Sequence, residues 1–278
     1  MPTYIVIALS LLISIPAFAK DITKRIVDFR HTRKEVRQVI FKTLNGKYSI
    51  SDSPDDYAYV RVTLIVPNEK KLADFEREPN IKQDFTNETL LIEQTNSNFE
   101  YLYEISLPEK ISLDITSDAS PLSIKNLKND ISLKTNHKDV LLENIKSGMI
   151  TVNSKSSKIT VKGCSAAFKF ITDNSDMDLN LLDGKLEIIA GKGEIQVNLS
   201  GEIPVEITSK SANVTLSIPK YVGYNCNFSS ADNILYDFRN VKFEGNISYK
   251  LLDGKLNGGG KTLKLTTSRG KITVYNAQ

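Results

Sequence analysis

The stretch ITVNSKSSKITV, residues 150–161, contains the triplet Ile-Thr-Val twice, nine positions apart. Six polar residues separate the two copies. An apolar–polar–apolar triplet is typical of a short β-strand, because successive side chains point to opposite faces. We therefore expect Val152 and Val161 to face a core, and Thr151 and Thr160 to face outward.

Similar paired triplets recur along much of the chain. First and second triplets begin at 131 and 140, 150 and 159, 168 and 177, 186 and 195, and 205 and 214, always nine residues apart. An earlier pair, at Ile111 and Leu122, has an eleven-residue spacing. First triplets recur every 18 to 20 residues, and a constant period near twenty is typical of repeat architectures.

The residues between the triplets are turn formers such as Asn, Asp, Ser and Gly. Each unit of about nineteen residues is thus expected to be one coil of strand, turn, strand and turn. Coils stacked ~4.8 Å apart would give an all-β fold, a two-sheeted β-solenoid or β-roll of short strands. The alternative is an antiparallel meander in a sandwich or barrel. A meander needs no constant spacing, so the regularity favours the solenoid.

Residues 1–19 predict a secretory signal peptide. An apolar run is followed by small residues at Ala17 and Ala19, which fits cleavage before Lys20. The run is shorter than the ~20 residues of a membrane-spanning helix, so no transmembrane span is expected in the mature chain. The segment lacks Lys and Arg, and a retained anchor or a buried N-terminal element remain alternatives.

Residues 20–108 are expected to form an N-terminal β-rich region, ahead of the repeats in 109–278. A strand pattern at 35–44 meets Asn45-Gly46, a strong hairpin signal, and continues in a second strand pattern. In residues 57–66, Ala58, Val60, Val62, Leu64 and Val66 share one face, which predicts a half-buried strand. Further strand patterns lie at 90–96 and 99–108, and Leu72 and Phe75 indicate a short helix in the polar segment 67–86.

The C-terminal part departs from the period. LLDGKL occurs at 181–186 and again at 251–256, and Asp-Gly predicts a tight turn in both copies. Residues 221–250 break the repeat and are expected to form an excursion or an atypical terminal coil. The chain then ends on NGGG-x-x-L-x-L-x-T-x-x-x-G-x-I-x-V, residues 257–274.

This ending, after coils of this period, resembles the bacterial family usually called putative adhesins, a domain of unknown function with β-strand repeats. The likeness covers roughly residues 25–278. Turns before second strands often carry Ser, Lys or Asp here, where the family tends to have Gly; Gly193 and Gly270 fit its pattern. The resemblance implies a secreted or envelope-located β-rich protein and brings no catalytic residues.

The sequence offers few residues for chemistry. It carries no Trp and only His31 and His137, both in polar surroundings and expected at the surface. A net charge of +3 gives no case for nucleic acid or an anionic membrane. Cys164 and Cys226 fall three or more coils apart, roughly 14 Å or more, so no disulfide is expected between them.

Three motifs resemble functional sites but lack a feature that each site needs. NGGGKT (257–262) lacks the spacing of a phosphate-binding loop and predicts a tight turn. DNSDMD (173–178) places Met177 where a calcium loop needs an oxygen ligand. Glu187 and Glu206 would be neighbouring acids on an outer face, without the confined cleft of a glycosidase. We predict no catalytic, cofactor-binding or metal-binding residues and no cofactor.

The outward positions form two predicted ladders rich in Ser and Thr. They are Ser112, Ser132, Thr151, Lys169, Glu187 and Glu206 on first strands, and Ser123, Leu141, Thr160, Asp178, Gln196 and Thr215 on second strands.

Hydroxyl and β-branched residues suit an exposed pleated face, which could also serve as a polar binding platform. The sequence therefore favours a non-catalytic exported envelope protein, in the periplasm or at the cell surface, with adhesin-like binding or scaffolding of an envelope glycan or protein. The alternative is a polysaccharide-processing enzyme on a β-helix scaffold. A periplasmic regulatory partner is a third option.

Overall fold

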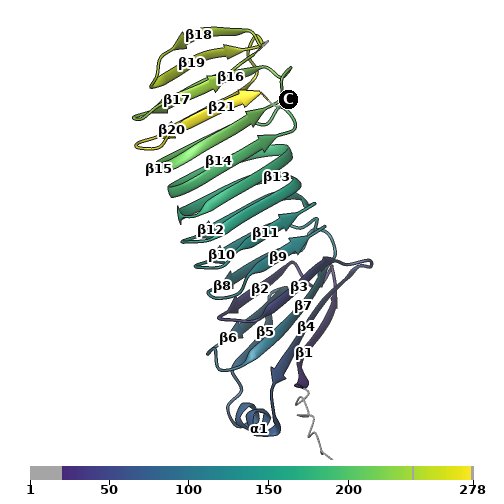
Figure 1. Cartoon of the computed structure of the whole chain (residues 1–278). Coiled ribbons are helices and arrows are strands. Elements are labelled where there is room, and N and C mark those ends of the chain that lie inside the picture. The colour runs from purple at the N-terminus through teal and green to yellow at the C-terminus, as the bar shows by residue number, and fades with distance from the viewer. Residues whose placement is uncertain (1–20, 240, 277–278) are drawn as a thin grey trace, which may run out of the picture.

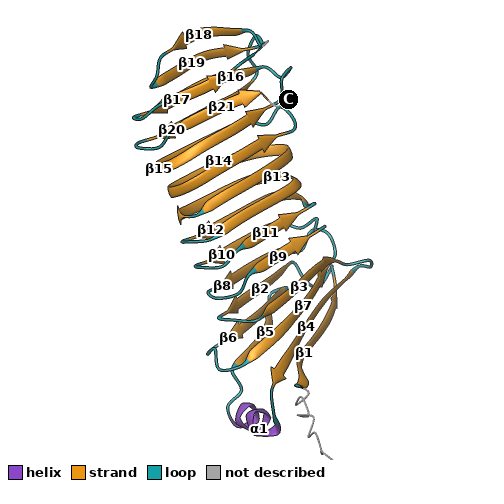
Figure 2. Ribbon diagram, in the orientation of Figure 1, coloured by secondary structure: helices purple, strands orange, loops and turns teal. Residues whose placement is uncertain are grey.

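The computed structural model describes residues 21–239 and 241–276, and within them it contains 21 β-strands and one α-helix. The predicted signal peptide, residues 1–19, lies outside the described residues. Figure 1 shows a long stack of strands with the helix at one end and β18 at the other. Strand is the predominant secondary structure of the described chain, as the colouring in Figure 2 shows. The expectation of an all-β solenoid is therefore confirmed.

The strands run in two series, which we call the first wall and the second wall. Three long strands turn a corner and belong to both: β13 (Lys158–Asn174), β14 (Asp176–Leu199) and β15 (Val205–Ile218).

The first wall runs β5 (Ile81–Thr86), β6 (Thr89–Gln94), β2 (Gln38–Thr43), β8 (Ser112–Ser117), β10 (Ile131–Thr135), β12 (Lys146–Ser154), β13, β14, β15, β20 (Lys261–Thr267), β16 (Tyr224–Ser230), β19 (Leu251–Leu256) and β18 (Phe243–Ile247). The second wall runs β1 (Ile22–Thr32), β4 (Tyr57–Val66), β7 (Glu100–Leu107), β3 (Lys47–Asp52), β9 (Leu122–Lys125), β11 (Val140–Glu143), β13, β14, β15, β21 (Ile272–Asn276) and β17 (Ile234–Asp237).

The repeat positions stack in parallel register, which rules out the antiparallel meander. Val152 and Val161 are fully buried, while Thr151 and Thr160 lie half-buried on the outer faces. The predicted alternation is therefore confirmed. Inward side chains of successive coils lie directly above one another, so the apolar interior is continuous along the stack.

The first coil begins two residues later than the sequence pattern indicated. Leu113, not Ile111, lies opposite Ile131, so Asp114 and not Ser112 is the outer-face neighbour of Ser132. From Leu113 the second triplet at Leu122 follows after nine residues. The prediction that the first triplet begins at Ile111 is therefore wrong. Residues 111–115 alternate throughout, so the sequence alone allows a triplet to begin at Ile111 or at Leu113.

The hairpin predicted at Asn45-Gly46 is wrong. β2 pairs with β6 and β8 in the first wall, whereas β3 pairs with β7 and β9 in the second, so the turn joins the two walls. The Gln94 side chain accepts hydrogen bonds from the Leu44 and Asn45 amides at 2.8 and 3.1 Å. A Cβ on Gly46 would lie 2.4 Å from the Tyr103 ring. These long-range contacts override the local hairpin signal.

The two LLDGKL copies have different structures. In the first, Gly184 has φ +116° at the bend of β14 between the walls. The second copy is β19 itself, and Gly254 lies inside that strand, facing Gly245 of β18. The tight turn predicted at Asp253-Gly254 is therefore wrong. A Cβ on Gly254 would lie 2.4 Å from a β18 carbonyl oxygen, so close strand approach explains this glycine.

The stretch 221–250 forms an atypical terminal coil, as expected, but the chain order is not the stacking order. β20 pairs with β15 on one side and with β16 on the other. The last segment of the chain is thus inserted between earlier coils. The coil of β16 and β17, extended by the antiparallel strands β18 and β19, becomes the outermost layer (Figure 1).

The helix and most N-terminal strands follow the predicted patterns, but strand β1 was not predicted. β4 occupies residues 57–66, and its alternate side chains are buried as predicted. α1 (Glu69–Arg77) begins after Asn68, whose side chain accepts a hydrogen bond from the Lys71 amide at 2.9 Å. Phe75 is buried and packs edge-on against Phe99. Strand β5 was not predicted either, because Ile81 and Phe85 are the only apolar residues among its six.

A row of buried hydroxyl residues follows one corner of the stack, a feature that the sequence analysis missed. Its members are successive register partners at the ends of first-wall strands, all at most 6 % exposed, and Ala190 alone interrupts them. We call this set the hydroxyl column: Thr43, Ser117, Thr135, Ser154, Thr172, Ser209, Thr267 and Ser230. The available signal was a Ser or Thr two residues after most first triplets.

The two cysteines are free and buried, which confirms the prediction that they do not form a disulfide. Cys164 lies on β13 at a corner, where its sulfur accepts a hydrogen bond from the Ile145 amide at 3.3 Å. Cys226 lies in β16, in the outermost coil.

Candidate functional site

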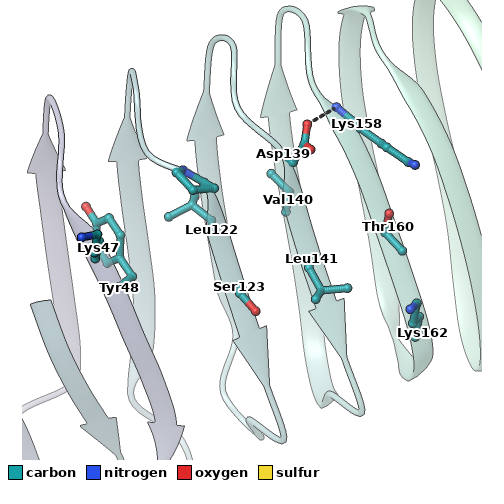
Figure 3. Close-up of a pocket in the computed structure, with 11 residues that line it drawn as sticks. Lys47, Tyr48, Leu122, Ser123, Asp139, Val140, Leu141, Lys158, Thr160 and Lys162 are labelled. Carbon is teal, nitrogen blue, oxygen red and sulfur yellow. Dashed lines mark hydrogen bonds between the residues drawn. The ribbon is translucent and has the colours of Figure 1, made fainter. Parts of the chain in front are cut away.

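A shallow groove of about 510 Å³ opens on the outer face of the second wall, where the N-terminal strands meet the regular coils. β3 contacts β9 at a single register pair, Ile50 with Ile124, so the two strands diverge beyond that point. β9 and β11 have only four residues each and leave the groove open at the side. Figure 3 shows the groove between β3 and the start of β13.

The groove is lined by cations, hydroxyls and small apolar surfaces. Its lysines are Lys47 on β3 and Lys158 and Lys162 on β13. Lys47 forms an ion pair with Glu100 at 2.8 Å, which raises its pKa. Among the described residues, neither of the β13 lysines forms an ion pair within 4.0 Å, so both ammonium groups remain available to an anion.

Register places one outward residue of each strand in a row across the groove, and two of the three carry hydroxyl groups. Ser123, Leu141 and Thr160 lie side by side on β9, β11 and β13. Asp139 lies at the upper rim, where it accepts a hydrogen bond from the Lys158 backbone amide at 3.3 Å (Figure 3). One oxygen of this carboxylate thus accepts from the backbone, and both β13 lysines expose their side chains.

This arrangement fits an elongated anionic ligand better than a small enclosed one. The groove is open along its length, whereas small-molecule sites are concave and enclose most of the ligand. Lysine ammonium groups would bind carboxylates, hydroxyls would exchange hydrogen bonds with hydroxyls, and Leu141 with Pro121 offers apolar surface to the C–H face of a sugar.

The acidic pair on the first wall is the other candidate from the sequence. Glu187 and Glu206 are register neighbours, as predicted. Each carboxylate has its own cation: Lys169 Nζ lies 2.9 Å from Glu187, and Lys264 Nζ lies 2.9 Å from Glu206. The Lys264 hydrogen bond holds the pKa of Glu206 below its usual value. A glycosidase general acid needs a raised pKa, so the shift has the opposite sign.

The structure also shows the local environment of the other motifs considered in the sequence and of the two histidines. Residues 257–260 form the tight turn predicted before β20, with φ positive at the first three of them. In DNSDMD, Ser175 and Met177 are buried, and the Ser175 hydroxyl accepts a hydrogen bond from the Ser157 amide at 3.2 Å. His137 is exposed, but His31 is half-buried against Phe29.

The described residues contain neither a cluster of potential metal ligands nor a helix that could span a membrane. No group of three or more His, Cys, Asp or Glu within 21–239 and 241–276 could hold a metal ion. No helix in that part of the chain is long and apolar enough to cross a membrane.

Comparison with known proteins places the chain. A family model described as Toastrack DUF4097 matches residues 44–275, which is most of the sequence. The chain belongs to the Toastrack family. The match begins just before β3 and includes the groove, all the coils and the inserted C-terminal strands. No protein of curated function matches this Toastrack chain.

Solved structures show a likeness over 93% of the chain. A putative adhesin from Bacteroides fragilis matches with a TM-score of 0.52 and 13% identity, over 93% of this chain and 97% of the other. A putative adhesin from Parabacteroides merdae has a TM-score of 0.46 and 12% identity, with the same coverage of both chains. A putative lipid binding protein from Parabacteroides distasonis has a TM-score of 0.42 and 10% identity, again over 93% of this chain and 97% of the other. Only the first of these supports the fold, and at 13% identity it supports the fold alone.

Proposed function

We propose that this Toastrack protein is exported and acts in the bacterial envelope as a non-catalytic, adhesin-like binding protein. We propose further that the groove on the second wall binds an acidic glycan. The observation that carries the proposal is the groove itself, with two lysines free of ion pairs near the hydroxyl groups of Ser123 and Thr160. Adhesin names among the similar structures are compatible with a binding role.

The stack explains why such a site needs no enzyme-like cavity. A carbohydrate chain that lies across strands can repeat the same contacts on neighbouring strands, and many weak contacts together give useful affinity. Each exposed lysine–carboxylate contact contributes only about 0.2–1 kcal/mol, and salt screens it. Moderate affinity with a strong dependence on ionic strength is therefore expected.

Binding can be measured with polygalacturonate as the acidic probe and dextran as the neutral one. The chain should bind polygalacturonate and not dextran in calorimetry at low salt. The double substitution Lys158→Gln with Lys162→Gln should weaken binding roughly tenfold, which corresponds to about 1.4 kcal/mol. Lys271→Gln is the matched control, because Lys271 is an exposed lysine beside β21, outside the groove. Equal losses in the control and the double variant would refute the groove as the site.

The same samples test the alternative of a polysaccharide-processing enzyme. Incubation with the polymers should release no new reducing ends. Cleavage that disappears on replacing a carboxylate of the groove or of the first wall would overturn the non-catalytic role.

Export is tested separately. Cell fractionation should find the protein outside the cytoplasm, and N-terminal sequencing should begin at Lys20. Exported protein that still begins at Met1 would refute the cleavage site.

A further inference from the structure

The outermost layer of the stack is unusually apolar. Six of the ten large hydrophobic side chains that are exposed among the described residues belong to residues 221–251. They are Tyr221, Leu235, Tyr236, Ile247, Tyr249 and Leu251. Since monomeric proteins rarely concentrate exposed apolar residues in one region, this layer is expected to contact something.

Part of this surface is the uncovered end of the core. Tyr236 on β17 lies opposite Val274, an inward residue, yet it is 46% exposed because no further coil covers it. Ile247 on β18 lies opposite the buried Leu252 and is 41% exposed for the same reason. Phe238 continues this surface, with ring centroids 5.5 Å from Tyr236 and 5.8 Å from Phe243.

β18 also leaves one backbone edge free. It pairs only with β19 among the described strands, so its other edge offers unpaired amide and carbonyl groups. The opposite end of the stack is protected differently. β1 is interrupted by a bulge between Arg25 and Val27, and β5 carries Lys82 and Asp84. A bulge and several charges hinder edge-to-edge pairing, whereas β18 pairs with β19 without a register shift and carries one charged residue, Glu244, on its outer face.

We propose that β18 pairs with β18 of a second copy of this chain, antiparallel about a two-fold axis at Gly245. In that register, Phe243 lies opposite Ile247 of the second copy, which continues the apolar inner face. Glu244 lies opposite Asn246, and Lys242 lies opposite Ser248, so no like charges meet. Lys242 and Glu244 already form an ion pair at 2.5 Å within one copy.

The two-fold geometry explains why the occupant is a second copy. An axis normal to the first wall keeps both inner faces on the same side, so the uncovered core ends, with Tyr236 and Phe238, also meet. The resulting end-to-end dimer closes and does not extend into a filament. It carries two grooves on one particle, which would raise the avidity for a polymer with repeated sites.

Sedimentation velocity over a concentration series tests the dimer. The chain should shift from monomer to dimer as concentration rises. Ile247→Asp places a carboxylate opposite Phe243 twice per dimer and should raise the dissociation constant by roughly 100-fold or more. Ile189→Asp is the matched control, because Ile189 is 47% exposed on the outer face of β14 and should leave the dissociation constant unchanged. Circular dichroism would establish that both variants fold.

A cysteine pair tests the register. Glu244→Cys and Asn246→Cys are prepared as two separate proteins. With an added oxidant, each alone should give no covalent dimer through its new cysteine, whereas the mixture should give a disulfide-linked dimer. A chain that stays monomeric at all concentrations, larger oligomers, a dimer insensitive to Ile247→Asp, or cross-linking of either variant with itself would each overturn the proposal.

Discussion

At the scale of single residues, the alternation of inward and outward side chains carries the stability of each coil. Val161→Ala removes buried methyl groups from a fully buried position and should lower the free energy of unfolding by about 1–3 kcal/mol. Thr160→Ala changes the neighbouring residue, which lies on the outer face, and should lower the free energy of unfolding by less than about 0.5 kcal/mol. Urea denaturation of both variants measures the difference. Equal losses would contradict the assignment of the two faces.

The hydroxyl column contains buried hydroxyls with a hydrogen-bond partner and buried hydroxyls without one. Thr135 Oγ1 has no hydrogen-bond partner, whereas Ser230 Oγ donates to the Gly270 carbonyl at 2.7 Å. Thr135→Val keeps the shape and removes an unsatisfied group, so it should raise the free energy of unfolding by about 1 kcal/mol. Ser230→Ala should lower it by about 0.5–1.5 kcal/mol. A destabilising Thr135→Val would mean that this hydroxyl has a partner.

At the scale of elements, the bends between the walls depend on glycine. Gly184 has φ +116°, and a Cβ there would lie 1.8 Å from the Ala166 carbonyl oxygen on the coil below. Gly184→Ala should therefore cost more than about 3 kcal/mol. Gly258→Ala is the control, since Gly258 has φ +85° with nothing within 4 Å, and only the backbone cost of about 1–2 kcal/mol applies. Thermal melts that shift equally would show that the close contact at Gly184 is absent.

Elements differ in how well the sequence predicts them, and the reason is the range of the interactions. The nine-residue spacing of the paired triplets predicted the coil strands, because apolar and polar side chains alternate within each triplet. Asn45-Gly46 gave a wrong hairpin because contacts with Gln94 and Tyr103, distant in sequence, decide its conformation. The groove was not predicted either. It exists because β3 leaves β9 after the one pair of Ile50 and Ile124, and no local pattern encodes that divergence.

At the scale of the whole molecule, stability should fall in alkali. Burial raises the pKa of both Tyr224 and Cys226 to about 12, and it also raises the pKa of Tyr48, Tyr101 and Tyr103. In the unfolded chain these groups ionise near their ordinary values of 9 to 10. The contribution of these buried neutral groups to the free energy of unfolding is therefore complete below about pH 9 and is lost as pH rises toward 12. Urea titrations at stepped pH should show this decline. Constant stability up to pH 11 would contradict the burial of these groups.

Strand order in the first wall is the feature on which the stack and its outermost layer depend. One column of register partners on the outer face runs in the order Asn153, Ile171, Ile189, Thr208, Thr266 and Ser229. Ser229 on β16 therefore lies beyond Thr266 on β20, although β16 precedes β20 in the chain. At ~4.8 Å per strand, Asn153 lies about 19 Å from Thr266 and about 24 Å from Ser229.

Electron–electron resonance between spin labels tests this order directly. Labels at Asn153 and Thr266 should give the shorter distance, and labels at Asn153 and Ser229 should give one about 5 Å longer. A shorter distance to Ser229 than to Thr266 would mean that the coils stack in chain order, and it would contradict the architecture.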